Sequence, residues 1–570
     1  MKFGDLDIFE RIAQKLTKES ACNYRPQECS NIIWSLASMR CLHQSINMLD
    51  ADEEKICSTI HTMFNDKGSS NVFIEAYDAV AEELMKRPDS FKDQELKDVI
   101  WSFGKTLFRH PKLFKSTAAY LLEDEPARIT SFSIQSTSNI VWSYAKLVRV
   151  ATQDPNYRSD TVRDSIDNTE ISAGKLGSFE FALMDYGDKL LLNFFQTISR
   201  KFLTEDLKSF TTQDLSNILW SYGVFGMLHK GVFDSFAAEI KRRMNLFNEE
   251  ERRAEFSMTF PTTRAPLVFS TQEIMNIMWS YSTTNHQSPI AREMFKATVP
   301  YIASKITAST ILKQGHFTTQ ELINILFSFC VFELYPEVIF RNAWELLGLN
   351  IADYEASRYE ADYEAKKGVS SAAADSPSKK TMSKQTIMAA MQVHLCVRNE
   401  AGFDLTIPKN FASYYGNQSL STSKMQDAVA QTCAKAGFDF VAEYIVANGD
   451  SEYPGRNFLS MDIADVGRKI AIEVDGPAHY INVIDEHEIR MKSEADGPTG
   501  DRNIDKQSSN MKFNMYRDVS GATFLKHRML CHEGWEVIHV PFFIWAKLLG
   551  EEERMQYVTE DLFGEFIEGM

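Results

Sequence analysis

The chain has 570 residues, of which 44% are apolar and 24% charged, and its formal net charge is −17. This length exceeds the ~100–200 residues of a typical domain, so we expect more than one core. The negative charge argues against a general polyanion binder, although a local basic groove on an acidic body is still allowed. No apolar run approaches the ~20 residues of a membrane span, and the eight cysteines show neither a CxxC nor a zinc-site spacing, which indicates reduced thiols.

A ten-residue phrase recurs six times in the first 350 residues. It reads Gln-x-x-x-[Asn/Asp]-[Ile/Val]-x-[Trp/Phe]-Ser plus one more residue, and its copies begin at Gln27, Gln94, Gln135, Gln213, Gln272 and Gln320. In the fourth copy the apolar residues recur at i, i+3, i+4 and i+7, which predicts one apolar face of a helix. Three copies also begin with a capping-box pattern: Thr211 to Asp214, Ser270 to Glu273 and Thr318 to Glu321.

A second amphipathic segment lies between successive phrases. These segments are Val72–Lys86, Lys112–Leu122, Leu191–Leu203, Val232–Met244, Ala291–Ile306 and Val338–Leu347. Each unit is therefore predicted to be a helical hairpin that buries its apolar face only by stacking on its neighbours. The sequence predicts an α-solenoid of about six two-helix units over residues 1–350, with an acidic insertion near 152–188.

Two sets of residues in this array are candidates for contacts with RNA. Gln213, Asn217 and Ser221 form a polar stripe that could read bases, or that could instead bond to the backbone and to the next unit. Basic clusters near the ends of second helices are the better electrostatic candidates, although each can also be a solvated helix face. They are Arg200-Lys201, Lys241-Arg242-Arg243 and Arg252-Arg253.

The composition changes after the repeats. Residues 351–384 are rich in Ala, Ser, Asp, Glu and Lys, and we interpret them as a flexible linker. From about Gln385 to the end, helix and strand patterns alternate in the order αβββαβ, followed by terminal helices, with a long polar insertion at about 483–521. We therefore expect a small α/β domain over residues 385–570.

The strand Lys469–Asp475 carries the most unusual pattern in this second domain. Ile470, Ile472 and Val474 alternate with Ala471, Glu473 and Asp475, so one face is apolar and the other carries two carboxylates. Carboxylates on a buried strand are costly unless they are paired, hydrogen-bonded or bound to a cation.

This stretch, with the segments Thr523–Leu530 and Gly534–Pro541 and with Trp545, resembles the RAP domain, over about 458–561 apart from the insertion. The repeats resemble those that precede RAP domains in heptatricopeptide- and octotricopeptide-repeat proteins and in FAST-kinase-domain proteins. The resemblance implies a fold like that of PD-(D/E)XK nucleases. It also implies an organellar RNA-binding protein that acts in RNA processing, stability, translation or ribosome assembly.

The same resemblance implies single-stranded or ribosomal RNA and ribonucleoprotein proteins as partners, and a location in the mitochondrion or, alternatively, the plastid. The acidic start of the chain lacks the Arg- and Ser-rich composition of a transit peptide. An alternative function is a structural subunit of an organellar ribosome that binds mainly protein. In the RAP domain, His479 and Arg528 are further candidate RNA contacts.

A third hypothesis is a Mg²⁺-dependent RNA endonuclease. If Val466-Gly467 is a two-residue hairpin loop, Asp465 faces Arg468, and Asp462 shares a face with Glu473 and Asp475. Asp462 and Glu473 would then hold the metal, with Glu443 beside them. The nuclease pattern has a lysine where this chain has Asp475, so Lys526 would have to supply that charge. The alternative is that these carboxylates serve as structural acceptors, and we expect no cofactor unless the nuclease hypothesis holds.

Overall fold

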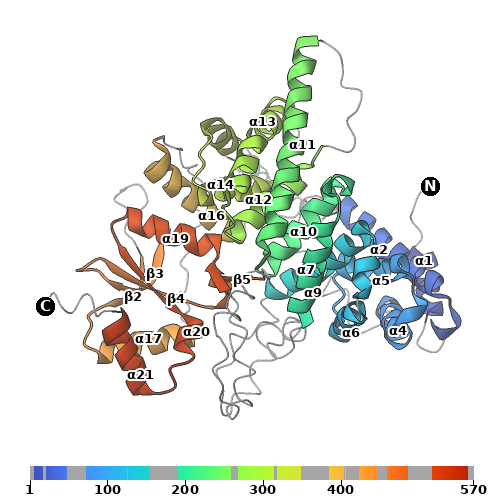
Figure 1. Ribbon diagram of the computed structural model, residues 1–570, viewed down its shortest axis with the longest axis horizontal. Coiled ribbons are helices and arrows are strands. Elements are labelled where there is room, and N and C mark those ends of the chain that lie inside the picture. The colour runs from blue at the N-terminus through green and yellow to red at the C-terminus, as the bar shows by residue number, and fades with distance from the viewer. Residues whose placement is uncertain are drawn as a thin grey trace, which may run out of the picture.

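The structure is a computed structural model that describes residues 6–16, 21–47, 72–124, 126–153, 190–257, 268–312, 317–347, 384–403, 405, 423–445, 459–484 and 516–562. It consists of an array of helices followed by a small α/β domain (Figure 1). The predicted linker and the greater part of the two predicted insertions lie outside the described residues.

The six phrases form six helices that pack side by side in chain order, and we call them the inner row. They are α2 (Pro26–Asn47), α5 (Asp93–Thr106), α7 (Ile134–Gln153), α10 (Thr212–Val224), α12 (Thr271–Thr283) and α14 (Thr319–Val331). Short 3₁₀ turns precede several of them: η1 (Ala21–Asn23), η3 (Arg128–Ser131) and η5 (Leu207–Ser209). The helical prediction for the phrase is confirmed.

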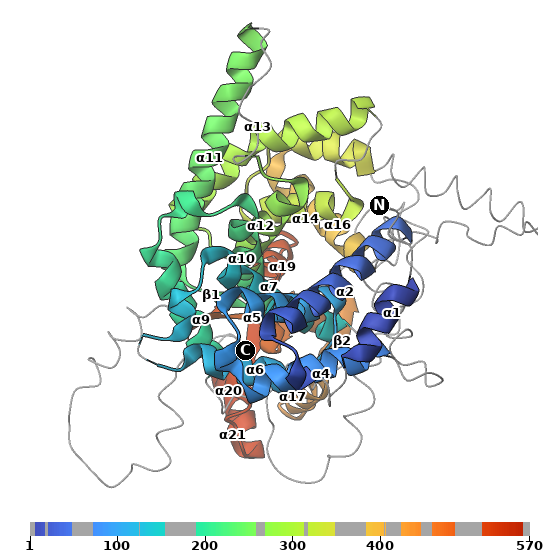
Figure 2. The same ribbon diagram turned by 90° about the vertical axis from the view of Figure 1, so that its right-hand side faces the viewer.

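The second segments form the outer row, which covers the apolar face of the inner row. It contains α4 (Val72–Lys86), α6 (Pro111–Leu122), α9 (Leu190–Thr204), α11 (Lys230–Ser257) and α13 (Pro289–Leu312), with residues 337–347 also helical. Helix α1 (Leu6–Lys15) packs on α4, and the 3₁₀ turn η2 (Pro88–Ser90) follows α4. The two rows make the predicted α-solenoid, and α11 continues past the predicted end at Met244 to project from it (Figures 1 and 2).

A carboxylate fixes the start of every inner helix except α7, where the Ser133 hydroxyl accepts the backbone N–H of Ser136 at 3.1 Å. All three predicted capping boxes are present, and the backbone N–H of Thr211, for example, donates to Asp214 Oδ2 at 3.0 Å. Glu95 likewise accepts from the N–H of Lys92 at 2.9 Å, and Glu28 from that of Arg25 at 2.9 Å. These bonds satisfy backbone donors that a helix leaves unpaired at its first turn.

The aromatic residue that ends most phrases joins the two rows. The hydroxyl of Tyr144 donates to the carbonyl of Phe114 at 2.7 Å, and that of Tyr281 donates to the carbonyl of Phe233 at 2.6 Å. Both rings are fully buried, and each packs edge-on against the phenylalanine whose carbonyl it binds. The phrase thus encodes both the apolar face of the inner helix and its registration on the outer helix.

The α/β domain is built on a four-stranded sheet in the order β2-β3-β4-β7. Its strands are β2 (Val441–Ile445), β3 (Ser460–Asp465), β4 (Ile470–Asp475) and β7 (Glu536–Pro541); only β4 and β7 are parallel. One face packs on α17 (Lys424–Lys435), α20 (Phe542–Trp545), α21 (Glu551–Gln556) and the π-helix η10 (Tyr557–Leu562). Helix α19 (Gly521–His532) covers the other face (Figure 1).

The α/β domain is joined to the repeats by a shared sheet and by α19. Strand β1 (Met227–Leu228), which follows α10, pairs in parallel with β5 (Tyr480–Val483), and β5 pairs with β6 (Tyr516–Val519). Helix α19 packs against α12 and α14. The sequence did not predict β1, β5 or β6, and β6 lies where we expected only a polar insertion.

Two further features complete the fold. Helix α16 (Lys384–Cys396) packs against α14 and so continues the inner row, and it leads into the π-helix η6 (Val397–Ala401). Among the described helices, none is both long and apolar enough to cross a bilayer.

Candidate functional site

The alternation predicted for β4 is confirmed, and it divides the sheet into an apolar and a polar face. Ile470, Ile472 and Val474 pack toward α17 and α20 in the apolar core. Glu473 and Asp475 lie on the face that α19 covers and are only 3% and 1% exposed. Two buried carboxylates at alternate positions of one strand therefore need partners, and α19 and β7 supply them.

The hairpin between β3 and β4 differs from our prediction. Asp465 pairs with Ile470 rather than facing Arg468, so the loop has four residues, 466–469, and not two. The longer loop forms because both Asp465 oxygens bind Arg468, one at its backbone N–H (3.0 Å) and one at Nε (2.7 Å), and because Lys469 adopts a left-handed backbone conformation (φ +55°). Since Ile463 pairs with Ile472, Asp462 and Glu473 come next along the two strands and lie opposite each other.

Lys526 on α19 reaches this pair of carboxylates. Its Nζ lies 2.5 Å from Glu473 Oε2, while Asp462 Oδ2 accepts the backbone N–H of Val474 at 2.7 Å. Glu443 joins the group electrostatically: burial and then the charge of Asp462 raise its pKa, and Lys526 opposes this. The structure thus brings Asp462, Glu473 and Lys526 together as the sequence suggested, but their catalytic role stays a prediction.

The donor set does not fit a resident Mg²⁺. One oxygen each of Asp462 and Glu473 is already bound by a protein donor, and Lys526 supplies the positive charge that the metal would bring. Mg²⁺ in proteins usually keeps several waters, which a residue as buried as Glu473 does not accommodate. Within the described ranges, no group of three or more His, Cys, Asp or Glu side chains is placed to hold a metal ion.

The pKa of Glu473 is raised from 4.5 to about 7, mainly because burial penalises the charged form, and Lys526 opposes this shift. Between these two values the folded state holds a proton that the unfolded chain releases, so stability should fall as pH rises through that window. We expect Glu473→Gln to remove this part of the pH dependence, as measured by denaturant unfolding at a series of pH values. The exposed Glu552→Gln serves as the control, and equal pH profiles for both variants would refute the assignment.

Asp475 organises a second network, at the carboxyl ends of β4 and β7. Its Oδ1 lies 2.9 Å from His479 Nδ1, and its Oδ2 lies 2.7 Å from His539 Nδ1 and 3.2 Å from the Tyr480 hydroxyl. Although burial opposes it, hydrogen bonds from His479 and His539 hold the pKa of Asp475 below its ordinary range. Asp475, which stands where the nuclease pattern has a lysine, is thus an ionised hydrogen-bond acceptor between the imidazoles of His479 and His539.

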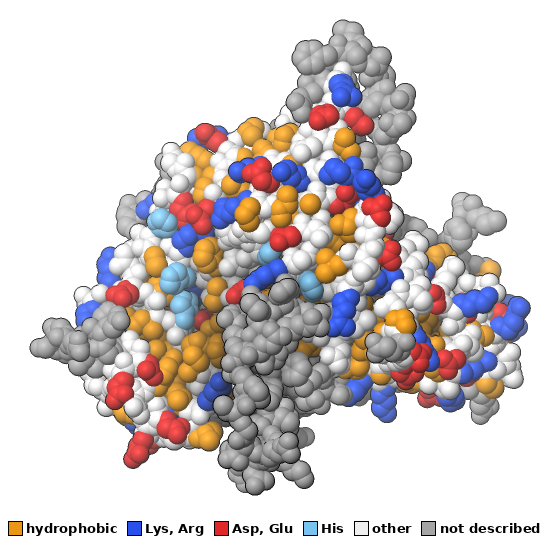
Figure 3. Space-filling model, in the orientation of Figure 1, with side chains coloured by type: hydrophobic (Ala, Val, Ile, Leu, Met, Phe, Trp, Pro, Cys, Tyr) orange, Lys and Arg blue, Asp and Glu red, His pale blue; other side chains and the backbone are white. Residues whose placement is uncertain are grey.

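This network continues to the surface through two residues that the sequence analysis missed. His539 Nε2 lies 2.9 Å from His527 Nδ1, and His527 Nε2 lies 3.6 Å from Cys531 Sγ. Burial raises the pKa of the Cys531 thiol, which therefore stays protonated near neutral pH. Histidine side chains are visible on this face of the domain, near α19 (Figure 3).

Arg528 lies at the interface with the repeats. Its guanidinium donates to the carbonyl of Cys330 at 2.5 Å and to Glu400 Oε1 at 2.8 Å, and its Nη1 lies 3.5 Å from Glu333 Oε1. It thereby satisfies the last carbonyls of α14, where a positive charge is also favoured by the helix dipole. Its carboxylate partners are thus Glu400 and Glu333, which lie outside the cluster around Glu473 and Asp475.

The basic residues predicted on the repeats differ in their surroundings. Arg243 is buried and donates to the carbonyls of Leu207 and Phe210, and Arg242 pairs with Glu239. Lys201 donates to the carbonyl of Thr130 at 2.9 Å.

Three of the predicted basic residues are less enclosed, and one of them is Arg242, which remains partly exposed although it pairs with Glu239. Lys241 lies 3.8 Å from Glu293 and is partly exposed, and Arg200 is exposed on α9. Contacts of these five residues with RNA remain predictions; Arg200 is exposed, and the side chains of Arg242 and Lys241 are 41% and 32% exposed.

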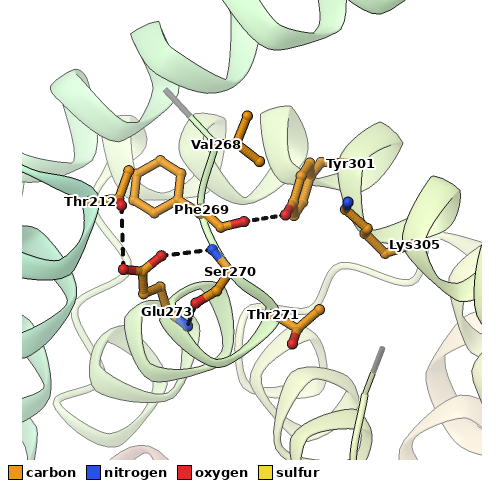
Figure 4. Close-up of a pocket in the computed structure, with 8 residues that line it drawn as sticks. All are labelled: Thr212, Val268, Phe269, Ser270, Thr271, Glu273, Tyr301 and Lys305. Carbon is orange, nitrogen blue, oxygen red and sulfur yellow. Dashed lines mark hydrogen bonds between the residues drawn. The ribbon is translucent and has the colours of Figure 1, made fainter. Parts of the chain in front are cut away.

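A cavity of about 510 Å³ lies beside the start of α12 (Figure 4). The hydroxyl of Thr212 donates to Glu273 at 3.3 Å, Glu273 also caps Ser270, and the Tyr301 hydroxyl binds the carbonyl of Phe269. The polar groups that line the cavity thus serve capping and packing, and we place no functional role there.

A comparison with protein families identifies the C-terminal domain. A family model described as the RAP domain matches residues 472–561. The match begins within β4 and includes Glu473, Asp475, Lys526 and Arg528, whereas Asp462 on β3 precedes it. A RAP domain is consistent with RNA binding. This chain is therefore an α-solenoid of two-helix repeats that ends in a RAP domain.

Proposed function

We propose that this protein binds RNA in a mitochondrion or plastid and acts there in RNA processing, stability, translation or ribosome assembly. The RAP domain at residues 472–561 carries the proposal, since this domain is consistent with RNA binding. The organelle and the process rest on the resemblance of the repeats to those of other RAP-domain proteins.

The contacts between the repeats and the α/β domain support the proposal that both form a single RNA-binding unit. Strand β1 of the repeats pairs with β5 of the α/β domain, and Arg528 binds the end of α14. An RNA held by the RAP domain would therefore lie next to the inner row of helices at a fixed position.

The test is ultraviolet crosslinking in cells, followed by sequencing of the bound RNA and identification of co-purifying proteins. We expect enrichment of organellar transcripts or ribosomal RNA over a mock purification. A sample without enriched RNA would defeat the proposal.

A structural subunit that binds mainly protein is the second candidate. It is favoured by the internal pairing of Lys201 and Arg243, which withdraws positive charge from the surface of a chain that is acidic overall. Recovery of a stable protein complex without enriched RNA in the same purification would support it. The endonuclease hypothesis requires Mg²⁺-dependent cleavage by the purified protein that Glu473→Ala abolishes.

A further inference from the structure

The network that begins at Asp475 ends at two side chains of α19, His527 and Cys531. They stand at i and i+4 of this helix, so they lie one above the other on the same face. His527 Nε2 lies 3.6 Å from Cys531 Sγ. The imidazole is partly exposed and the cysteine is exposed, so a solute can reach both. A nitrogen donor and a sulfur donor therefore meet at the surface of the RAP domain.

The hydrogen bonds behind His527 determine which of its nitrogens carries the hydrogen. Asp475 is an ionised acceptor, so the nitrogen of His539 that faces it, Nδ1, is the one that bears a hydrogen. In the neutral form of the two rings, His539 Nε2 then accepts, and His527 Nδ1 donates to it across 2.9 Å. This tautomer leaves His527 Nε2 with a lone pair on the side of Cys531.

The separation of the two donor atoms fits the coordination sphere of a metal ion. Zinc binds imidazole nitrogen at ~2.0–2.1 Å and thiolate sulfur at ~2.3 Å, and a tetrahedral arrangement then places two such ligands about 3.5 Å apart. The distance from His527 Nε2 to Cys531 Sγ, 3.6 Å, is close to this value. An ion bound by both atoms therefore requires little movement of either side chain.

His527 also has the support that metal-bound histidines usually have. In metal sites, the ring nitrogen that does not bind the metal donates to a carboxylate, a carbonyl or a water, and this bond orients the ring. Here His527 Nδ1 donates to His539, which donates in turn to the buried carboxylate of Asp475. The negative charges of Asp475 and of a Cys531 thiolate together balance a divalent cation.

We propose that His527 Nε2 and Cys531 Sγ bind a divalent transition-metal ion of the zinc class. On binding, the Cys531 thiol releases its proton to solvent, and the thiolate becomes the ligand. Water fills the remaining positions, so the ion exchanges with solution more readily than one held by four protein ligands. The site is separate from the Asp462 and Glu473 pair, whose oxygens are bound by protein donors.

The two donor atoms also determine which ions bind and what binding does to the fold. Imidazole and thiolate suit zinc and its neighbours among the transition metals, whereas Mg²⁺ and Ca²⁺ take oxygen ligands. A bound ion polarises the Nδ1–H of His527 and so strengthens its bond to His539 on β7. The ion therefore holds α19 more firmly to the sheet, and the folded protein gains stability as the metal concentration rises.

The experiment titrates the full chain, free of any polyhistidine tag, with Co²⁺ and then with Zn²⁺. Co²⁺ bound to a thiolate gives a ligand-to-metal charge-transfer band in the near ultraviolet, and Zn²⁺ should remove this band by displacing Co²⁺. Cys531→Ser should abolish the band, and His527→Ala should weaken binding by about 10-fold or more. His539→Ala removes only the support behind His527, so it should keep the band and weaken binding by about 10–100-fold.

Cys22→Ser and His532→Ala are the matched controls. Cys22 is the other exposed cysteine among the described residues. His532 follows Cys531 on α19, but its Nε2 lies 3.2 Å from Glu400 Oε1. Both variants should bind Co²⁺ as the unaltered chain does. Zn²⁺ should also raise the unfolding temperature of the unaltered chain and leave that of Cys531→Ser unchanged.

Three results would overturn the proposal. Without a charge-transfer band in the unaltered chain, His527 and Cys531 share only an S–H···N hydrogen bond. If Cys531→Ser binds Co²⁺ as tightly as the unaltered chain, the ion lies elsewhere, and loss of the band in Cys22→Ser has the same meaning. Cys531→Ser exchanges one atom of an exposed side chain, and circular dichroism verifies that it folds.

Discussion

Replacing Arg528 with alanine is expected to destabilise the protein by about 3–5 kcal/mol, the usual cost of removing one partner of a buried ion pair. The change leaves the Glu400 carboxylate, which is largely buried, without its guanidinium partner, and it removes the donor that binds the carbonyl of Cys330. Faster hydrogen exchange in α14 and α19, together with a lower unfolding temperature, would show the loosened interface.

Lys296→Ala provides the control for Arg528, because it removes an exposed ion pair with Glu293 on the surface of α13. Exposed pairs of this kind contribute about 0–1 kcal/mol, so the control should unfold almost as the unaltered chain does. Equal losses of stability in the two variants would mean that Arg528 does not hold the RAP domain to the repeats.

Gly521→Ala should separate α19 from the repeats without changing any charge. A Cβ added at Gly521 would lie 1.7 Å from the carbonyl oxygen of Ser282 on α12, which is far inside van der Waals contact and is backbone that cannot rotate away. Overpacking typically costs about 1–3 kcal/mol, and a backbone clash this close exceeds that range unless the domain shifts. Limited proteolysis near α19 and a larger radius of gyration in solution scattering are the expected signs.

Gly550→Ala is matched to this change, because a Cβ there would meet nothing closer than 4.0 Å. Both substitutions add one methyl group near the start of a helix of the same domain. If Gly521→Ala and Gly550→Ala give the same proteolysis pattern and the same scattering profile, the close approach of α19 to α12 is not present in solution.

The repeats could be predicted from the sequence because each copy of the phrase specifies its own helix without distant residues. Each phrase carries its own apolar face, and the capping residues Thr211, Ser270 and Thr318 mark where the helices begin. The end of α11 could not be read in the same way, since no Gly or Pro follows Met244 until Pro261. Strands β1 and β6 are short, and they exist only because β5 pairs with both of them.

Only the carboxylates on β4 could be predicted from the sequence pattern, because the rest of the site comes from other elements. Glu473 and Asp475 stand out because carboxylates interrupt an apolar strand, whereas Lys526 is a candidate only because Asp475 stands where the nuclease pattern has its lysine. His539 alternates with Ile538 and Val540 on β7, a signal that points to a polar face but not to Asp475, because only the parallel pairing of β4 with β7 brings them together. The contact of Arg528 with α14 depends on domain docking, which no local pattern encodes.

The pairing of β1 with β5 has a consequence for the order of folding during synthesis. Gly226 and Leu228 offer their carbonyls to the backbone N–H groups of Asn482 and Ile484, residues that the ribosome adds more than two hundred positions later. Contacts of such sequence separation form late, because a long loop must close before they are gained. The ends of α10, α12 and α14 therefore stay uncovered in every nascent chain that stops before α19. Nascent chains arrested there are expected to recruit chaperones until the last hundred residues emerge.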